Sequence, residues 1–174
     1  MFCIMQTVAE LMALAARTAP KGLGQDYLDI QVLVGDDLLQ LADEMDRFGK
    51  ATGRINFDRD AENIRRSDAV LLVSLRENEP LGLNCGACGH DTCTQLASRQ
   101  GPEFEGPLCA WRVVDLGIAV GSAAKTAGLL NADNRVMYRP AAVARRMGFV
   151  QGALVCAIPI SATGKNIYFD RPVK

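Results

Sequence analysis

The chain has 174 residues, 49% of them hydrophobic, which is enough for one domain with a real core but short for two. Its 19 basic and 20 acidic residues leave a net charge of −1 with no long run of like charge, so nucleic acid and anionic membranes are poor candidate partners. The apolar runs at 69–73 and 153–158 are far shorter than the roughly 20 residues that a membrane helix needs. The first residues lack the basic and apolar regions of a secretory signal. We therefore expect a single cytoplasmic domain over residues 1–174.

Hydrophobic periodicity predicts helices and strands that alternate along the chain. The predicted elements, in chain order, are a helix at 7–17, a strand at 27–34, a helix at 36–49, a helix at 58–66, a central strand at 69–75, a helix at 111–130, a helix at 140–147 and a strand at 152–158.

Several of these boundaries rest on capping and breaking signals. Thr7 and Glu10 have the spacing of a capping box, and Gly49 is expected to end the second helix. The helix at 111–130 is apolar on nearly all sides, so we expect it to be buried. The tail from residue 161 onward shows no periodicity. The alternation of predicted helices and strands along the chain indicates an α/β fold.

Four of the six cysteines fall within a 25-residue window, at Cys85, Cys88, Cys93 and Cys109. A reducing cytosol makes clustered thiols more typical of metal or redox sites than of structural disulfides. Four thiolates are the number that a tetrahedral zinc and a cubane iron–sulfur cluster both require. The spacing alone does not separate these two metals, and a disulfide or unligated thiols are the further alternative.

Neighbouring residues favour the iron–sulfur interpretation. Gly86 and Gly89 follow two of the cysteines directly and allow tight turns that aim backbone N–H groups at sulfur. Residues 94–100 can begin a helix after Cys93, whose N-terminal dipole favours anionic sulfur. His90 is the single histidine, which excludes a histidine-rich metal site.

The cysteine segment resembles a known cluster motif. The stretch "CGACGHDTCTQLA", followed by Cys109, is similar to the iron–sulfur motif of bacterial electron-transfer proteins, although Ala110 stands where many such motifs have proline. The stretches "VAELMALAARTAPKG", "LNCGACG", "DLGIAVGSAA", "DNRVMY" and "IPISATGKNIYFDR" are similar to a family of bacterial and archaeal proteins described as containing a ferredoxin domain. That resemblance implies a [4Fe-4S] cluster on the four cysteines, but no reaction is established for the family.

The order of elements also resembles a shortened flavin-dependent nitroreductase. This resemblance implies an α/β (α+β) fold with a layered sheet flanked by helices, in which residues 76–111 are an inserted, cysteine-rich, ferredoxin-like cluster segment. It further implies a homodimer with FMN at the subunit interface. The side chains and backbone that fit flavin contacts are Arg17, Lys21, Gly22, Lys165 and Arg171. Nitroreductases normally carry an Arg-Ser-x-Arg stretch before the first helix, and residues 1–6 contain no arginine.

Two functional hypotheses follow from these residues. In the first, the protein is an iron–sulfur redox protein, either an electron carrier for a partner protein or a flavin-linked oxidoreductase. In the second, the four thiolates bind zinc and pin a loop to an α/β module that binds a small molecule or a protein. The sequence assigns no catalytic residue, so it leaves open whether the protein is an enzyme.

Overall fold

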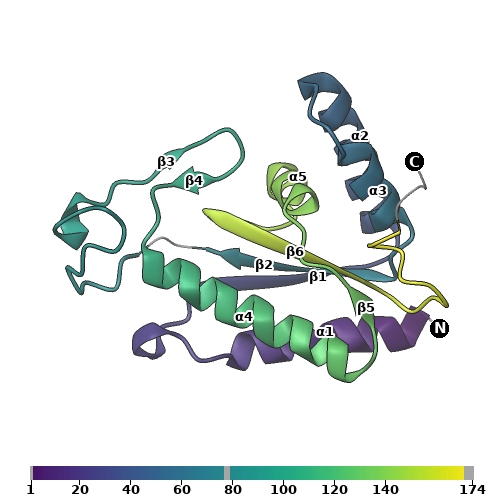
Figure 1. The fold of residues 1–174 in the computed structure, drawn as a ribbon, viewed down its shortest axis with the longest axis horizontal. Coiled ribbons are helices and arrows are strands. Elements are labelled where there is room, and N and C mark those ends of the chain that lie inside the picture. The colour runs from purple at the N-terminus through teal and green to yellow at the C-terminus, as the bar shows by residue number, and fades with distance from the viewer. Residues whose placement is uncertain (1, 77–78, 171–174) are drawn as a thin grey trace.

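The computed structural model describes residues 2–76 and 79–170, apart from the side chains of residues 2 and 3, and has helices on both faces of a sheet (Figure 1). The α-helices are α1 (Phe2–Thr18), α2 (Asp36–Thr52), α3 (Phe57–Arg65), α4 (Ala110–Leu129) and α5 (Arg139–Met147). The strands are β1 (Leu28–Leu33), β2 (Ala69–Leu75), β3 (Arg99–Gln100), β4 (Glu105–Gly106), β5 (Asp133–Asn134) and β6 (Leu154–Ser161). Short 3-10 turns are η1 (Gly22–Gly24) and η2 (Cys93–Gln95).

Within the described residues, four strands form the main sheet in the order β1-β2-β6-β5, and all neighbours are antiparallel. Leu75 at the end of β2 lies opposite both Leu28 and Leu154, which begin β1 and β6. We call this end, where residues 28, 75 and 154 lie side by side, the loop end of the sheet. Strands β3 and β4 form a separate ribbon. The predicted mixed α/β class is confirmed.

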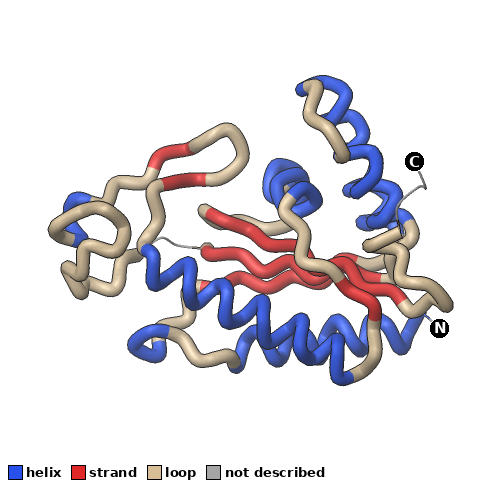
Figure 2. Tube along the Cα trace, viewed as in Figure 1, coloured by secondary structure: helices blue, strands red, loops and turns tan. Residues whose placement is uncertain are grey.

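Strand β2 is buried along its whole length because helices cover both faces of the sheet (Figure 2). Leu71 and Val73 face the cluster formed with α1 and α4, whereas Val70 and Leu72 face α2, α3 and α5. Full burial of such a side chain contributes roughly 1.5–3 kcal/mol, so this strand is a main source of stability. The prediction of a central strand at 69–75 is confirmed.

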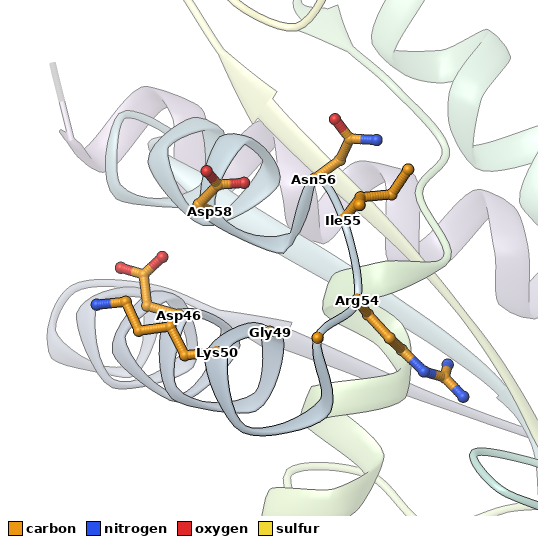
Figure 3. Close-up of a pocket in the computed structure, with 8 residues that line it drawn as sticks. Asp46, Gly49, Lys50, Arg54, Ile55, Asn56 and Asp58 are labelled. Carbon is orange, nitrogen blue, oxygen red and sulfur yellow. The ribbon is translucent and has the colours of Figure 1, made fainter.

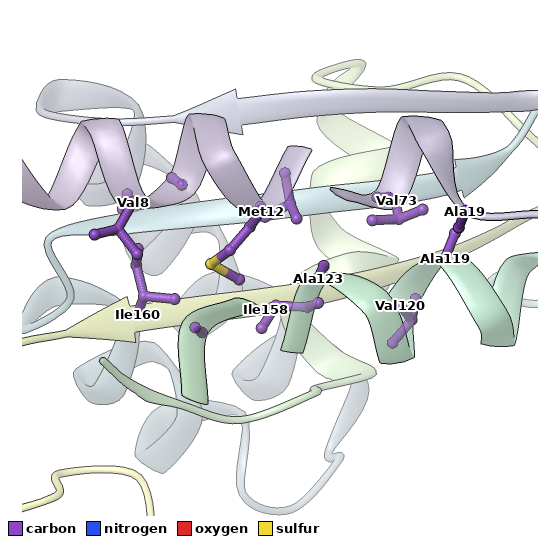
Figure 4. Close-up of a cluster of buried hydrophobic side chains, with 14 of the residues drawn as sticks. Val8, Met12, Ala19, Val73, Ala119, Val120, Ala123, Ile158 and Ile160 are labelled. Atoms are coloured by element: carbon purple, nitrogen blue, oxygen red, sulfur yellow. The ribbon is translucent and has the colours of Figure 1, made fainter. Parts of the chain in front are cut away.

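Helices α1 and α4 pack together against one face of the sheet (Figure 4). Met12 of α1 lies beside Ala123 of α4, and Ala19, directly after α1, lies beside Ala119; both alanines of α4 are completely buried. Side chains of this size allow the two helix axes to lie close together. The first turns of α4 are thereby held beside η1, where the Gly22 N–H donates to the Asp115 carboxylate.

The predicted end of the second helix was wrong. Helix α2 continues through Gly49 to Thr52 and ends at Gly53, whose φ of 68° is left-handed. Gly49 has a different role, because a Cβ at this position would lie 2.7 Å from the Cβ of Phe57. Glycine is required here because α3 approaches closely, and not because the helix ends.

The first helix and the long helix also differ from their predictions. Helix α1 begins at Phe2 and not at Thr7, since the apolar spacing extends back to the buried Met5. Helix α4 buries one face only, and Trp111 and Ile118 on its other face are 46% and 41% exposed. An apolar composition on all sides therefore did not predict full burial.

The C-terminal part is more ordered than its sequence pattern indicates. Strand β6 extends past the predicted end at residue 158 to Ser161. Ile167 and Tyr168 then pack with Met137 in a small buried cluster, although they belong to no periodic pattern.

Candidate functional site

The cysteine-bearing segment, residues 79–109, follows β2 at the loop end of the sheet and leads into α4 (Figure 1). Cys109 is the N-cap residue of α4 and is only 6% exposed. Cys85 is exposed, and Cys88 and Cys93 are half-buried. The four predicted ligands thus comprise one anchored, buried thiol and three thiols on an adjoining loop.

Two glycines shape this loop as predicted. Gly86 and Gly89 have φ values of +72° and +87°, which side chains with a Cβ rarely adopt. The Gly89 N–H donates to the Gly86 carbonyl at 2.9 Å and closes a turn around Cys88. Cys88 therefore lies within a hydrogen-bonded turn that directly follows Cys85.

Asn84 joins the two ends of the turn region in a way that the sequence interpretation missed. Its side-chain oxygen accepts from the Cys93 N–H at 2.8 Å, and its own N–H donates to the Cys93 Sγ at 3.3 Å. Its backbone is left-handed, with φ of 47°, a conformation that Asn tolerates better than most residues. The sequence signal that could have indicated this contact is an Asn directly before the first cysteine.

The sulfur of Cys85 also receives hydrogen bonds. The Ala87 N–H and, after it, the Trp111 indole N–H lower the pKa of the Cys85 thiol, because both donors stabilise the thiolate. Trp111 belongs to the first turn of α4, two residues after Cys109. The exposed Cys85 therefore lies beside the helix that begins at the buried Cys109.

The four cysteines have the chemistry of ligands for a thiolate-bound metal group, although their side chains do not point to a common centre. Among the described residues, no group of three or more His, Cys, Asp or Glu side chains lies close enough to hold a metal ion. Within the same residues, Cys85, Cys88, Cys93, Cys109 and Cys156 form no disulfide. Four thiols with N–H donors directed at two of their sulfurs are what an anionic sulfur-ligated group requires.

The helix expected after Cys93 is absent from its predicted range of 94–100. Residues 94 and 95 belong to the 3-10 turn η2, whose N-cap residue Thr92 makes a capping box with Gln95. Residues 99 and 100 instead belong to β3, in the ribbon that Arg145 of α5 holds through the Glu105 carboxylate at 2.6 Å. Pairing in this ribbon therefore replaces the predicted helix, and its dipole is not available to Cys93.

The residues predicted to contact FMN after the first helix are already bonded within the chain. Arg17 donates to the Asp26 carboxylate at 2.6 Å and to the Leu28 carbonyl at 2.8 Å. Lys21, whose side chain is 5% exposed, donates to three carbonyl oxygens in residues 16–19 at 2.7–3.3 Å. Because Lys21 satisfies carbonyls at the C-terminal end of α1 and Arg17 is bonded to Asp26 and Leu28, neither side chain fits a flavin phosphate as it stands.

The remaining predicted flavin contacts do not gather around these residues. The Gly22 N–H donates to the Asp115 carboxylate at 2.8 Å. Lys165 pairs with Asp170 at 2.9 Å and follows Ser161, at the end of the sheet opposite the loop end. Arg171 lies outside the described residues. Within one chain, the predicted flavin contacts are therefore divided between the two ends of the sheet, and FMN binding stays a prediction.

A buried ion pair beside the cysteines was also missed by the sequence interpretation. Arg112 and Asp115 in the first turns of α4 are 1% and 6% exposed, and their side chains meet at 3.3 Å. Two opposite charges three residues apart, in a helix that is otherwise nearly free of charge, were the signal that could have found them.

A surface cavity of about 480 Å³ lies away from the cysteines, where the end of α2 meets the start of α3 (Figure 3). Asp46, Lys50, Arg54 and Asp58 are among the residues that line it, and the Arg54 guanidinium donates to the Tyr138 hydroxyl at 3.2 Å. None of the cysteines lines this cavity, so it is separate from the candidate metal site.

No helix among the described residues combines the length and apolar character needed to cross a membrane.

Comparison with known proteins identifies the family. A family described as "uncharacterized protein containing a ferredoxin domain" matches residues 105–171, which include Cys109. An uncharacterised protein from Archaeoglobus fulgidus is 42% identical over 168 residues, covering 95% of this chain and 91% of the relative. The chain belongs to this family.

Solved structures show the same fold. A nitroreductase with bound FMN from Desulfitobacterium hafniense has a TM-score of 0.55 at 16% identity, covering 91% of this chain and 78% of its own. The FMN-dependent nitroreductase NfnB from Mycobacterium smegmatis, solved in complex with NADPH, has a TM-score of 0.58 at 12% identity, covering 97% and 84%. The predicted nitroreductase-like fold of this family member is confirmed.

Proposed function

We propose that this protein is an iron–sulfur redox protein in which Cys85, Cys88, Cys93 and Cys109 hold a [4Fe-4S] cluster. The observation that carries the proposal is the Asn84 N–H that donates to the Cys93 Sγ at 3.3 Å. The lowered pKa of the Cys85 thiol, caused by the Ala87 N–H and the Trp111 indole N–H, supports it. Such hydrogen bonds stabilise sulfur in its anionic form and tune the reduction potential of a cluster. When bound, the cluster accepts and releases one electron.

The position of Cys109 supports the same group. Its thiol is buried at the N-terminus of a 20-residue helix, where the helix dipole favours negative charge. The exposed Cys85 lies on the solvent side. Cys109 therefore ties the cluster to the fold while the loop leaves one side of it accessible to another protein.

The redox partner in this proposal is an external protein and not a resident flavin. The flavoprotein neighbours carry FMN, but Arg17 and Lys21 here use their donors within the chain. Cys85 and Trp111 are both exposed, so electrons can enter or leave at the surface of the cysteine segment. The membership of a family with a ferredoxin domain agrees with this role.

Oxygen-free purification and reconstitution with iron and sulfide test the proposal. We expect brown protein whose visible absorption bleaches on reduction with dithionite, with iron and acid-labile sulfide in equal amounts. A colourless protein with one zinc per chain would instead support a zinc-stabilised binding module without redox activity.

Serine variants identify the ligands. Replacing Cys85, Cys88, Cys93 or Cys109 with serine should each reduce the iron content sharply, because a hydroxyl is a much poorer ligand than a thiolate. Cys156→Ser, on β6, is the matched control and should keep the wild-type iron content. Equal iron content in all five variants would contradict the ligand assignment.

A further inference from the structure

One guanidinium connects three separate parts of the chain at the loop end of the sheet. Arg112 donates from Nε to the Glu79 carbonyl at 2.8 Å, from Nη2 to the Gln25 side-chain oxygen at 2.5 Å, and from Nη1 to Asp115 at 3.3 Å. Glu79 belongs to the beginning of the cysteine-bearing segment, and Gln25 to the turn before β1. Arg112 itself follows Cys109, the last cysteine of the segment, by three residues.

The surroundings of this guanidinium hold it in place. The Tyr27 ring centroid lies 4.4 Å from the Arg112 Cζ, a distance at which a cation is attracted to the ring face. Asp115 is fixed in turn, since it accepts from the Gly22 N–H at 2.8 Å. A Cβ on Gly22 would come within 2.8 Å of the Leu81 side chain, so the cysteine-bearing segment packs directly on this turn.

Burial makes these contacts more informative than those of a surface arginine. A charge removed from water is costly unless it is paired and hydrogen-bonded, and an apolar side chain could fill the same volume without that cost. The planar guanidinium offers donors in several fixed directions, which a lysine ammonium does not. The bonds made by Arg112 therefore fix the relative positions of the segments it reaches.

We infer that Arg112 is a positioning residue that joins the two ends of the cysteine-bearing segment and so sets where Cys85, Cys88 and Cys93 lie relative to Cys109. The segment is bonded to Arg112 at Glu79 and enters α4 at Cys109, so one side chain closes the loop. Closing it in advance reduces the conformational freedom that a metal group must otherwise remove on binding. The inference rests on the proposed function only for the identity of the bound group.

Two variants and one control test this role. Arg112→Lys keeps the charge opposite Asp115 but cannot reach Glu79 and Gln25 together. The double variant Arg112→Met with Asp115→Asn removes both buried charges, so that neither is left unpaired, and the Asn oxygen can still accept from the Gly22 N–H. Arg139→Met is the matched control, because Arg139 also pairs with a buried carboxylate, Asp60 at 2.9 Å, which keeps Arg59 as a second partner.

The first measurement uses metal-free protein and amide hydrogen exchange. In both Arg112 variants we expect faster exchange across residues 79–109, with protection of β2 and β6 unchanged and no change in the control. Unchanged exchange in 79–109 would overturn the inference. Loss of protection throughout the sheet in both variants would also overturn it, because Arg112 would then support the whole fold and not the segment.

The second measurement uses reconstituted protein and follows the release of metal to a chelator. We expect release about 10- to 100-fold faster in the Arg112 variants than in the wild type or the control, the range typical for loss of a group that supports metal ligands. We also expect a shifted midpoint potential, which a purely structural residue far from the group would not cause. Equal release rates and equal potentials in variant and wild type would overturn the inference.

The two proposals fail separately. If the wild type takes up zinc and no iron, the redox function fails, while metal release from the variants still tests Arg112. If the wild type holds the cluster and the Arg112 variants match it in exchange and release, only the positioning role fails.

Discussion

The hydrogen bonds between Asn84 and Cys93 run in both directions across the cysteine turn. One uses the Asn84 side chain and the other its backbone N–H, at 2.8 Å and 3.3 Å. The left-handed φ of 47° at Asn84 places both groups toward Cys93. At the scale of single residues, the metal site therefore depends on a side chain that is not itself a predicted ligand.

Substitution of Asn84 separates the side-chain contact from the backbone conformation. Asn84→Gly keeps access to positive φ but removes the acceptor, and Asn84→Ala removes both advantages. We expect Asn84→Gly to weaken metal retention about fivefold, since one hydrogen bond is worth about 1 kcal/mol, and Asn84→Ala to weaken it further. Asn84→Asp keeps the acceptor and should retain metal better, as chelator titrations would measure. Wild-type retention in Asn84→Gly would show that only the backbone conformation matters.

Tyr168 gives a pH dependence at the same scale. Burial raises the pKa of Tyr168 from its usual 10.0 to about 12, and its hydroxyl lies 2.9 Å from Ser67 Oγ. Between these pH values the unfolded chain has lost the phenol proton and the folded chain has kept it, so stability falls as pH rises. This stabilisation of the folded state is fully present below pH 10. Roughly 2–3 kcal/mol of it is lost by pH 12.

Urea unfolding from pH 8 to 12 measures this loss. The wild type should lose that amount of unfolding free energy relative to Tyr168→Phe, which has no proton to release. Parallel pH curves for the two proteins would contradict the assignment.

At the scale of elements, periodicity predicted which segments are helices and strands but not how their ends meet. The strand at 69–75 and the helix at 140–147 were predicted within one residue because core positions repeat along them. The end of α2 was missed because Gly49 marks contact with α3, which only tertiary structure reveals. The cysteine quartet could be named from spacing alone, whereas Asn84 and Arg112 act through partners distant in sequence.

Gly49 and Gly128 provide a matched test of this explanation. Alanine favours a helix interior over glycine by about 1 kcal/mol, so Gly128→Ala, with no atom within 4 Å of its new Cβ, should stabilise the protein by up to that amount. Gly49→Ala should destabilise by roughly 1–3 kcal/mol because its Cβ meets Phe57. Denaturant unfolding of both variants measures the two signs. A stabilising Gly49→Ala would show that the contact with α3 does not require glycine at this position.

At the scale of the whole molecule, the outer sides of α1 and α4 leave apolar side chains exposed. Ile4 and Leu14 of α1 are 67% and 59% exposed, and Val114 and Ile118 of α4 are 44% and 41% exposed. Large exposed apolar areas are typical of interaction surfaces. The homodimer expected from the sequence remains a prediction, and this face is where we expect it to form.

A charged substitution tests that dimer. Val114→Glu combined with Ile118→Glu should convert a dimer to monomer, because association would bury two carboxylates without partners. Ile55→Glu is the control, since Ile55 is 77% exposed on the turn between α2 and α3. Sedimentation velocity measures all three proteins. A monomeric wild type, or a dimer unaffected by the double variant, would contradict this assignment.

Native mass spectrometry of oxygen-free, reconstituted protein tests the [4Fe-4S] assignment, because one spectrum reports the bound group and the oligomeric state. We expect each chain to gain the mass of four iron and four sulfide ions, and a serine in place of Cys85, Cys88, Cys93 or Cys109 to remove this gain. A chain that carries a single zinc ion, or that stays metal-free after reconstitution, would contradict it.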